Sequence, residues 1–220
     1  MEFNPPRYHL NIKDPGSALT HFIGFVAALS ASPFLIGHMI DLHAPIKTII
    51  GCMIFCLGML LLYGASTTYH TINTNALIFK KIDHMMIFVL IAGSYTPICL
   101  TLLGSQGIIL LTIIWLLALI GIVMMLFFVT CPKWVSSIAY IAMGWACIFA
   151  LPSIIAATST AGIIWLVTGG IIYTIGGVIY ALKIKALQEI FPCFGLHEIF
   201  HIFVMGGTFC HFIFMYFYLI

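Results

Sequence analysis

Charged side chains are scarce in this sequence of 220 residues. Only 6% of the residues are Asp, Glu, Lys or Arg and 63% are hydrophobic, whereas a soluble domain carries about 25% charged residues. So few charges could not cover a surface that faces water, and the mean hydropathy is +1.19. The composition therefore excludes a soluble protein and predicts an integral membrane protein. The basic residues are few and scattered, and we expect no nucleic-acid partner.

Disulfide patterns and targeting signals are missing as well. Five of the seven cysteines lie inside apolar runs, where cysteine behaves as a small hydrophobic residue. The first 17 residues are polar and contain proline, so they do not resemble a secretory signal peptide. We expect the apolar segments of the chain itself to hold it in the membrane.

The sequence contains several apolar runs that are long enough to cross a bilayer. A membrane-spanning helix needs about 20 apolar residues. We expect Pro33, Pro97 and Pro152 to kink or end their helices. Seven runs qualify, at roughly 18–38, 47–69, 83–103, 108–129, 135–152, 162–182 and 196–219.

The basic residues predict the orientation of these helices. With a cytoplasmic N-terminus, seven of the eight Lys and Arg residues lie on the cytoplasmic side, and only Lys47 lies outside. The positive-inside rule therefore places the N-terminus in the cytoplasm and the C-terminus outside. We predict an all-α integral membrane protein with a cytoplasmic segment, 1–17, and one domain of seven transmembrane helices, 18–220.

Rare polar residues gather at the predicted cytoplasmic end, where ionisable groups are costly and usually functional. His197 and His201 are four residues apart at the start of the seventh run, so they share a helix face at a spacing that zinc sites use. His70, at the end of the second run, would supply a third nitrogen and leave one position for water. Asp83 could act as general base or orient a histidine, and Ser66 shares a helix face with His70. Zinc lowers the pKa of its bound water to about 7.

Structural explanations for these residues stay open. Each histidine could bond a neighbouring helix without any metal. Asp83 could form an ion pair with Lys80 or Lys81, and Ser66 could bond the carbonyl one turn earlier. His84 follows Asp83 directly, and we expect it to point elsewhere.

Other candidate ligands are weaker. His211 lies ten residues after His201, about 15 Å further along the helix, so it cannot share the same metal. We expect it to face a cavity or a neighbouring helix. A polar cluster at 38–43 belongs to the outer side, where a solvated loop is favoured over a second metal. Cys193 is near the inner site in sequence and is a less favoured ligand.

The sequence also contains H-E-x-x-H, the zinc motif of metalloproteases, in which the glutamate is the base. Here the motif consists of His197, Glu198 and His201. Such proteases take a third ligand from further along the chain, but this motif lies on the last helix. The third ligand must come from upstream, so a protease is disfavoured and Glu198 becomes a bystander.

Together, these motifs resemble the haemolysin III family of the progestin and adipoQ receptor superfamily, which includes the adiponectin receptors. The resemblance implies a zinc ion near the inner leaflet with His70, His197 and His201 as ligands, Asp83 reaching the metal through water, and Ser66 beside it. The matching motifs are "THFIGF", S-x-x-x-H ending at His70, K-x-x-D-H with the later "IAGSYTP", and H-x-x-x-H ending at His201.

The resemblance also implies a function. Relatives in the superfamily hydrolyse ceramide, which suggests a zinc-dependent hydrolase of lipid amides or esters. Its substrate would be a sphingolipid-like or other acyl-chain lipid, and its role membrane-lipid homeostasis. The long soluble N-terminal region of the receptor branch is not seen, which favours a protein of the bacterial inner membrane. The alternative is a non-enzymatic lipid-sensing, haemolytic or pore-forming protein with a structural zinc. "DPGSALTH" stands where the family has an acidic pair, and we expect this difference to leave the metal site unaffected.

Overall fold

The computed structural model describes residues 12–74, 76–182 and 195–220. Within these ranges every regular element is a helix, and seven segments are long and apolar enough to cross a membrane. This confirms the predicted all-α class with seven membrane spans. The segments are α1 (Pro15–Asp41), α2 (Ile46–Thr71), α3 (Ala76–Leu102), α4 (Gly104–Phe128), the combined α5–η1–α6 (Lys133–Ala157), α7 (Thr160–Leu182) and α9 (Leu196–Phe217).

Proline and glycine set several of the helix ends. Pro15 occupies the first turn of α1, and Pro45 and Pro132 directly precede α2 and α5. Proline suits these positions because its fixed φ and missing N–H cost nothing at a helix start. Gly104 has a φ of +53°, a conformation that glycine adopts without strain. It allows α4 to begin directly after α3.

The fifth span is broken, where the sequence predicted one continuous run at 135–152. It consists of α5 (Lys133–Gly144), the 3-10 helix η1 (Trp145–Ala150) and α6 (Leu151–Ala157). Pro152 stands in the first turn of α6, whereas α1 and α3 continue through Pro33 and Pro97. At the break, the Tyr95 hydroxyl lies 2.6 Å from the carbonyl oxygen of Gly144 and accepts the amide N–H of Cys147 at 2.9 Å. A side chain of α3 thus satisfies backbone groups that a lipid environment would leave unpaired.

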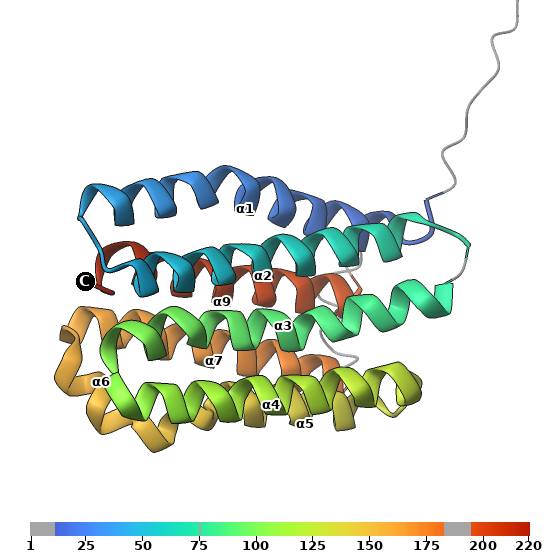
Figure 1. The fold of residues 1–220 in the computed structure, drawn as a ribbon. Helices are drawn as coiled ribbons and strands as arrows, with labels where there is room; N and C mark the ends of the chain where they lie inside the picture. The colour runs from blue at the N-terminus through green and yellow to red at the C-terminus, as the bar shows by residue number, and fades with distance from the viewer. Residues whose placement is uncertain (1–11, 75, 183–194) are drawn as a thin grey trace, which may run out of the picture.

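The helices run side by side along one axis (Figure 1). Helix α2 packs against α1 and α3, α3 against α4, and α7 against α5 and α9, while α1 also contacts α9. The start of α1, the end of α2 and the start of α3 lie at one end of the bundle, opposite the C-terminus (Figure 1). Helix α3 begins earlier than the predicted span at 83–103, so Asp83 lies about two turns inside it.

The surface of the bundle is apolar, as lipid requires. Large hydrophobic side chains point outward, with Phe149, Phe34 and Phe127 exposed to 88%, 71% and 70%. Buried ionisable side chains include His21, His70, Asp83 and His201. Apolar side chains outside and ionisable side chains inside are the reverse of the arrangement in a soluble domain. This arrangement agrees with an integral membrane protein.

Close packing between α2 and α3 gives a first prediction. A Cβ atom at Gly51 would lie 2.7 Å from the Pro97 Cα, and backbone cannot move aside as a flexible side chain can. We expect Gly51→Ala to lower the free energy of unfolding in detergent by about 1–3 kcal/mol, measured from the midpoint of thermal unfolding. Gly37→Ala is the matched control, because a Cβ there meets nothing within 4 Å. Equal stability of the two variants would contradict this account of the α2–α3 contact.

Candidate metal centre

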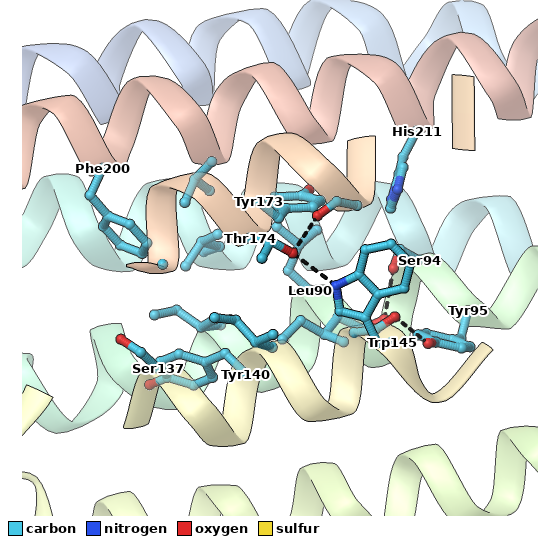
Figure 2. A pocket seen from close by; sticks show the side chains of 18 residues that line it. Leu90, Ser94, Tyr95, Ser137, Tyr140, Trp145, Tyr173, Thr174, Phe200 and His211 are labelled. Carbon is cyan, nitrogen blue, oxygen red and sulfur yellow. Dashed lines mark hydrogen bonds between the residues drawn. The ribbon is translucent and has the colours of Figure 1, made fainter. Parts of the chain in front are cut away.

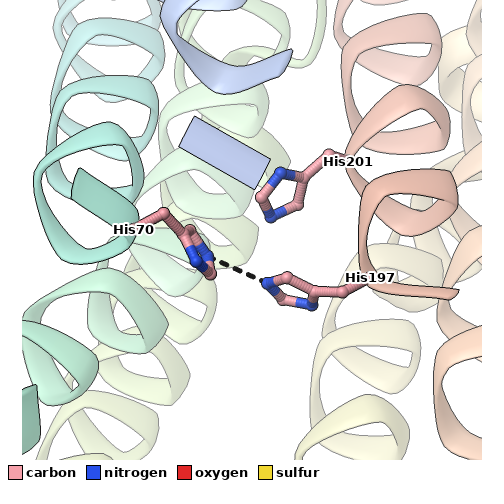
Figure 3. Close-up of side chains that lie close together, drawn as sticks. All are labelled: His70, His197 and His201. Atoms are coloured by element: carbon pink, nitrogen blue, oxygen red, sulfur yellow. Dashed lines mark hydrogen bonds between the residues drawn. The ribbon is translucent and has the colours of Figure 1, made fainter. Parts of the chain in front are cut away.

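Three histidines converge at the end of the bundle where α2 ends and α9 begins (Figure 3). One ring nitrogen from each of His70, His197 and His201 lies within 4.8 Å of the other two, and this is the one such group of potential ligands within the described residues. The Nε2 atoms of His70 and His197 are 3.0 Å apart. His197 and His201 occupy successive turns of α9, so their shared face follows from local helix geometry.

The chemistry of this group fits a zinc ion. Neutral imidazole is a common zinc ligand at about 2.0–2.1 Å, and the three nitrogens are close enough together to surround one ion. His70 and His201 are 3% and 1% exposed, so the nitrogens are largely shielded from solvent. The assignment of these residues as ligands stays a prediction.

Asp83 and Ser66, the two predicted catalytic residues, are both buried and differ in their partners. Asp83 is 5% exposed and lines a small cavity together with His197 and His201. Its carboxylate lies 3.5 Å from Nδ1 of His84, not beside Lys80 or Lys81. The Ser66 hydroxyl is fully buried and bonds no group of the described chain, so the expected alternative of a bond to its own helix is wrong. A buried hydroxyl without a partner is rare, and a role at a functional site is one explanation for it.

Two more histidines line the same cavity. His21 of α1 stacks on His201 with ring centroids 3.5 Å apart and an interplanar angle of 11°. Neither of its ring nitrogens has a hydrogen-bond partner among the residues described. His84, expected to point elsewhere, also lines this cavity. The sequence motif "THFIGF" was the only signal for His21, and spacing alone gave none.

The stretch "DPGSALTH", whose lack of an acidic pair we expected to leave the metal site unaffected, contacts the histidines directly. Asp14 Oδ2 lies 3.0 Å from Nδ1 of His70, and Thr20 Oγ1 lies 3.0 Å from Nδ1 of His201. Burial acts to raise the pKa of the Asp14 carboxyl, but the hydrogen bond from His70 and the charge of Lys13 hold that pKa below its ordinary value. Asp14 is therefore ionised at neutral pH. Sequence reasoning singled out neither Asp14 nor Thr20.

Glu198, the glutamate of H-E-x-x-H, faces α1. Its Oε1 accepts a hydrogen bond of 2.6 Å from the Ser17 hydroxyl. A Cβ atom at Gly16 would lie 3.2 Å from the Glu198 Cγ, so the absence of a side chain there makes room for the carboxylate. This contact supports the bystander role expected for Glu198.

A larger apolar cavity adjoins the histidine cavity, and Figure 2 shows the side chains that line it. It extends from Phe200 to Trp145 and His211. It shares part of its wall with the histidine cavity, namely Leu62, Ile87, Tyr140, Phe200 and Val204. Trp145 donates from Nε1 to Thr174 at 2.8 Å.

His211 lines this larger cavity, as expected, and does not join the metal group. Its Nδ1 has no partner in the described part of the chain, and its ring meets Tyr173 edge-on with centroids 5.3 Å apart. At the opposite end of the bundle, His38 stacks on Tyr216. Cys193 lies outside the described residues.

The family model described as "Haemolysin-III related" matches residues 10–212. The chain belongs to the haemolysin III family. Among its haemolysin III relatives, the "Hemolysin-3 homolog" of Bacillus subtilis (strain 168) is 40% identical over 195 residues, which cover 87% of each chain. "Hemolysin-3" of Bacillus cereus is 36% identical over 195 residues, covering 87% of this chain and 85% of the relative.

A more distant relative supports the likeness to the progestin and adipoQ receptor superfamily. The "Adiponectin receptor protein" of Drosophila melanogaster is 24% identical over 222 residues. The match covers 90% of this chain but only 49% of the receptor. The haemolysin III membership and this likeness confirm the resemblance drawn from the motifs.

A cluster of three hydroxyls joins α2, α7 and α9. The Tyr63 hydroxyl donates to Thr208 Oγ1 at 2.8 Å, and the Tyr173 hydroxyl lies 2.8 Å from the same oxygen. Thr208 itself donates to the Val204 carbonyl at 2.9 Å, so both tyrosines must donate to it. Thr208 thus links the three helices through hydrogen bonds.

This cluster gives a second prediction. Thr208→Val keeps the shape of the side chain but leaves two buried tyrosine hydroxyls without their acceptor. We expect the free energy of unfolding in detergent to fall by about 1–3 kcal/mol, measured by thermal unfolding. Thr112→Val is the control, because that hydroxyl is exposed and bonds only its own helix. A Thr208→Val protein as stable as the control would show that the cluster does not hold the helices.

Proposed function

We propose that this haemolysin III protein is a zinc-dependent hydrolase of lipid amides or esters in the bacterial inner membrane. The observation that carries the proposal is the convergence of His70, His197 and His201 near a small cavity that is lined by the buried Asp83 and shares other wall residues with a larger apolar cavity. This arrangement offers a polar reaction site next to space for an acyl chain.

The residues of the site have distinct roles in this proposal. His70, His197 and His201 would hold the zinc ion, which when bound polarises a carbonyl and lowers the pKa of water. Asp83 takes a proton from the water that attacks the carbonyl carbon. It then returns that proton to the nitrogen or oxygen of the leaving group as the C–N or C–O bond breaks. The Ser66 hydroxyl, which has no other partner among the described residues, donates to the developing oxyanion.

The apolar cavity supports a substrate with an acyl chain. Its lining is mostly aliphatic and aromatic, with the Ser94 hydroxyl engaged by the Ile91 carbonyl and the Trp145 N–H engaged by Thr174. An acyl chain in this cavity would bring its carbonyl to the wall that the two cavities share. A sphingolipid-like lipid or another long-chain amide or ester meets these requirements.

Metal content tests the first step of this proposal. We expect the full-length protein, purified in detergent, to contain about one zinc per chain by plasma mass spectrometry. Each of His70→Ala, His197→Ala and His201→Ala should lose most of it, because two remaining ligands hold zinc weakly. His38→Ala is the control, since this histidine stacks on Tyr216 away from the site. Unchanged zinc content in all three variants would place the metal elsewhere.

Turnover tests the second step. The zinc-loaded protein should release fatty acid from a mixture of N-acyl sphingoid bases, N-acyl amines and phospholipids, measured by mass spectrometry. We expect Asp83→Asn to lower kcat by about 100-fold or more while zinc content stays at one per chain, because the proton acceptor is lost. Ser66→Ala should lower kcat by about 100-fold as well.

Absence of turnover would favour the alternative function. If the zinc-loaded protein releases no fatty acid and His70→Ala unfolds at a lower temperature, the metal joins α2 to α9 as a structural element. Conductance through liposomes that persists in His70→Ala would instead favour a pore-forming protein.

A further inference from the structure

The first turns of α1 contact both helices that carry the candidate ligands. Asp14, directly before α1, bonds His70 of α2 through its carboxylate and donates its backbone N–H to the His70 carbonyl at 2.9 Å. Thr20, less than two turns into α1, bonds His201 of α9. The two side chains therefore meet the ligand set from the side of α1, which itself supplies no ligand.

The hydrogen bonds fix which ring nitrogen carries the proton. An ionised carboxylate can only accept, so Nδ1 of His70 donates to Asp14 and Nε2 keeps its lone pair. The Thr20 hydroxyl donates to the Ser17 carbonyl at 3.0 Å, so its oxygen must accept from Nδ1 of His201. Both histidines therefore present an Nε2 lone pair, which is the form that binds a metal.

His197 differs from the other two histidines. Its Nδ1 is buried and has no partner within the described residues. Its Nε2 lies 3.0 Å from Nε2 of His70. Helix α1 thus fixes the ring orientation of two of the three candidate ligands, whereas the described residues offer no such partner to Nδ1 of His197.

The glutamate of H-E-x-x-H belongs to the same set of contacts. Ser17 donates to Glu198 between the positions of Asp14 and Thr20 on α1. This bond attaches the first turn of α9 to α1, directly between His197 and His201 in sequence. Its effect is to hold the turn that carries two ligands in register with α1.

From these contacts we infer that Asp14 and Thr20 are positioning residues that set the zinc affinity of the centre, by fixing the rings of His70 and His201 with Nε2 facing the metal. The inference rests on the proposed metal site but not on hydrolysis. Partners of this kind on the second ring nitrogen typically change metal affinity by about 10–100-fold.

The test is zinc affinity of the full-length protein in detergent, measured by competition with a chelator of known affinity. We expect Asp14→Ala and Thr20→Val each to weaken zinc binding by about 10–100-fold. Thr20→Ser should restore wild-type affinity, because serine keeps the hydroxyl that accepts from His201. Asp14→Asn should be intermediate, since its amide oxygen accepts without a charge. Thr112→Val on α4, with an exposed hydroxyl, is the control.

The outcomes separate this inference from the metal site itself. If the wild type binds one zinc and Thr20→Val binds it equally tightly, the positioning role is wrong and the metal site stands. If the wild type binds no zinc, both fail. The Thr20→Val and Thr20→Ser pair decides the question even if Asp14→Ala does not fold. The absorption spectrum of bound Co²⁺ gives a second readout, because a purely structural role of Thr20 would leave it unchanged.

Discussion

A bilayer offers no water to buried polar groups, so a polar group inside this bundle is costly unless another group pairs with it. Tyr95 of α3 satisfies the backbone where the fifth span breaks. Thr208 of α9 accepts from tyrosines on α2 and α7. The same cost makes the histidines at the start of α9 informative, because ionisable groups at membrane depth are usually functional.

Helix α1 connects the two helices that carry the three histidines. It packs against both α2 and α9, and its contacts to His70, Glu198 and His201 come from a short stretch at its start. A metal held by α2 and α9 would therefore be supported by three helices. This also distinguishes the motif H-E-x-x-H here from its use in metalloproteases, because Glu198 is bonded to Ser17 and points toward α1.

The polar and apolar parts of the interior share a wall. The histidine cavity and the larger cavity are both lined by Phe200 and Val204 of α9, so an amphiphilic molecule could occupy both at once. Membership of the haemolysin III family accounts for the ligand motifs but does not by itself assign a reaction. The pairing of a carboxylate with an apolar cavity is what makes lipid hydrolysis the favoured function.

The sequence by itself determined the seven spans and the shared face of His197 and His201, because bilayer thickness and the helical repeat act over short stretches. The orientation inferred from basic residues also brought His70 and Asp83 to the same layer. Only the tertiary structure decided that Asp14 and Thr20 contact the histidines, since these hydrogen bonds join residues 56 and 181 positions apart. The break in the fifth span likewise depends on Tyr95, a side chain 48 and more positions away, which no local pattern encodes.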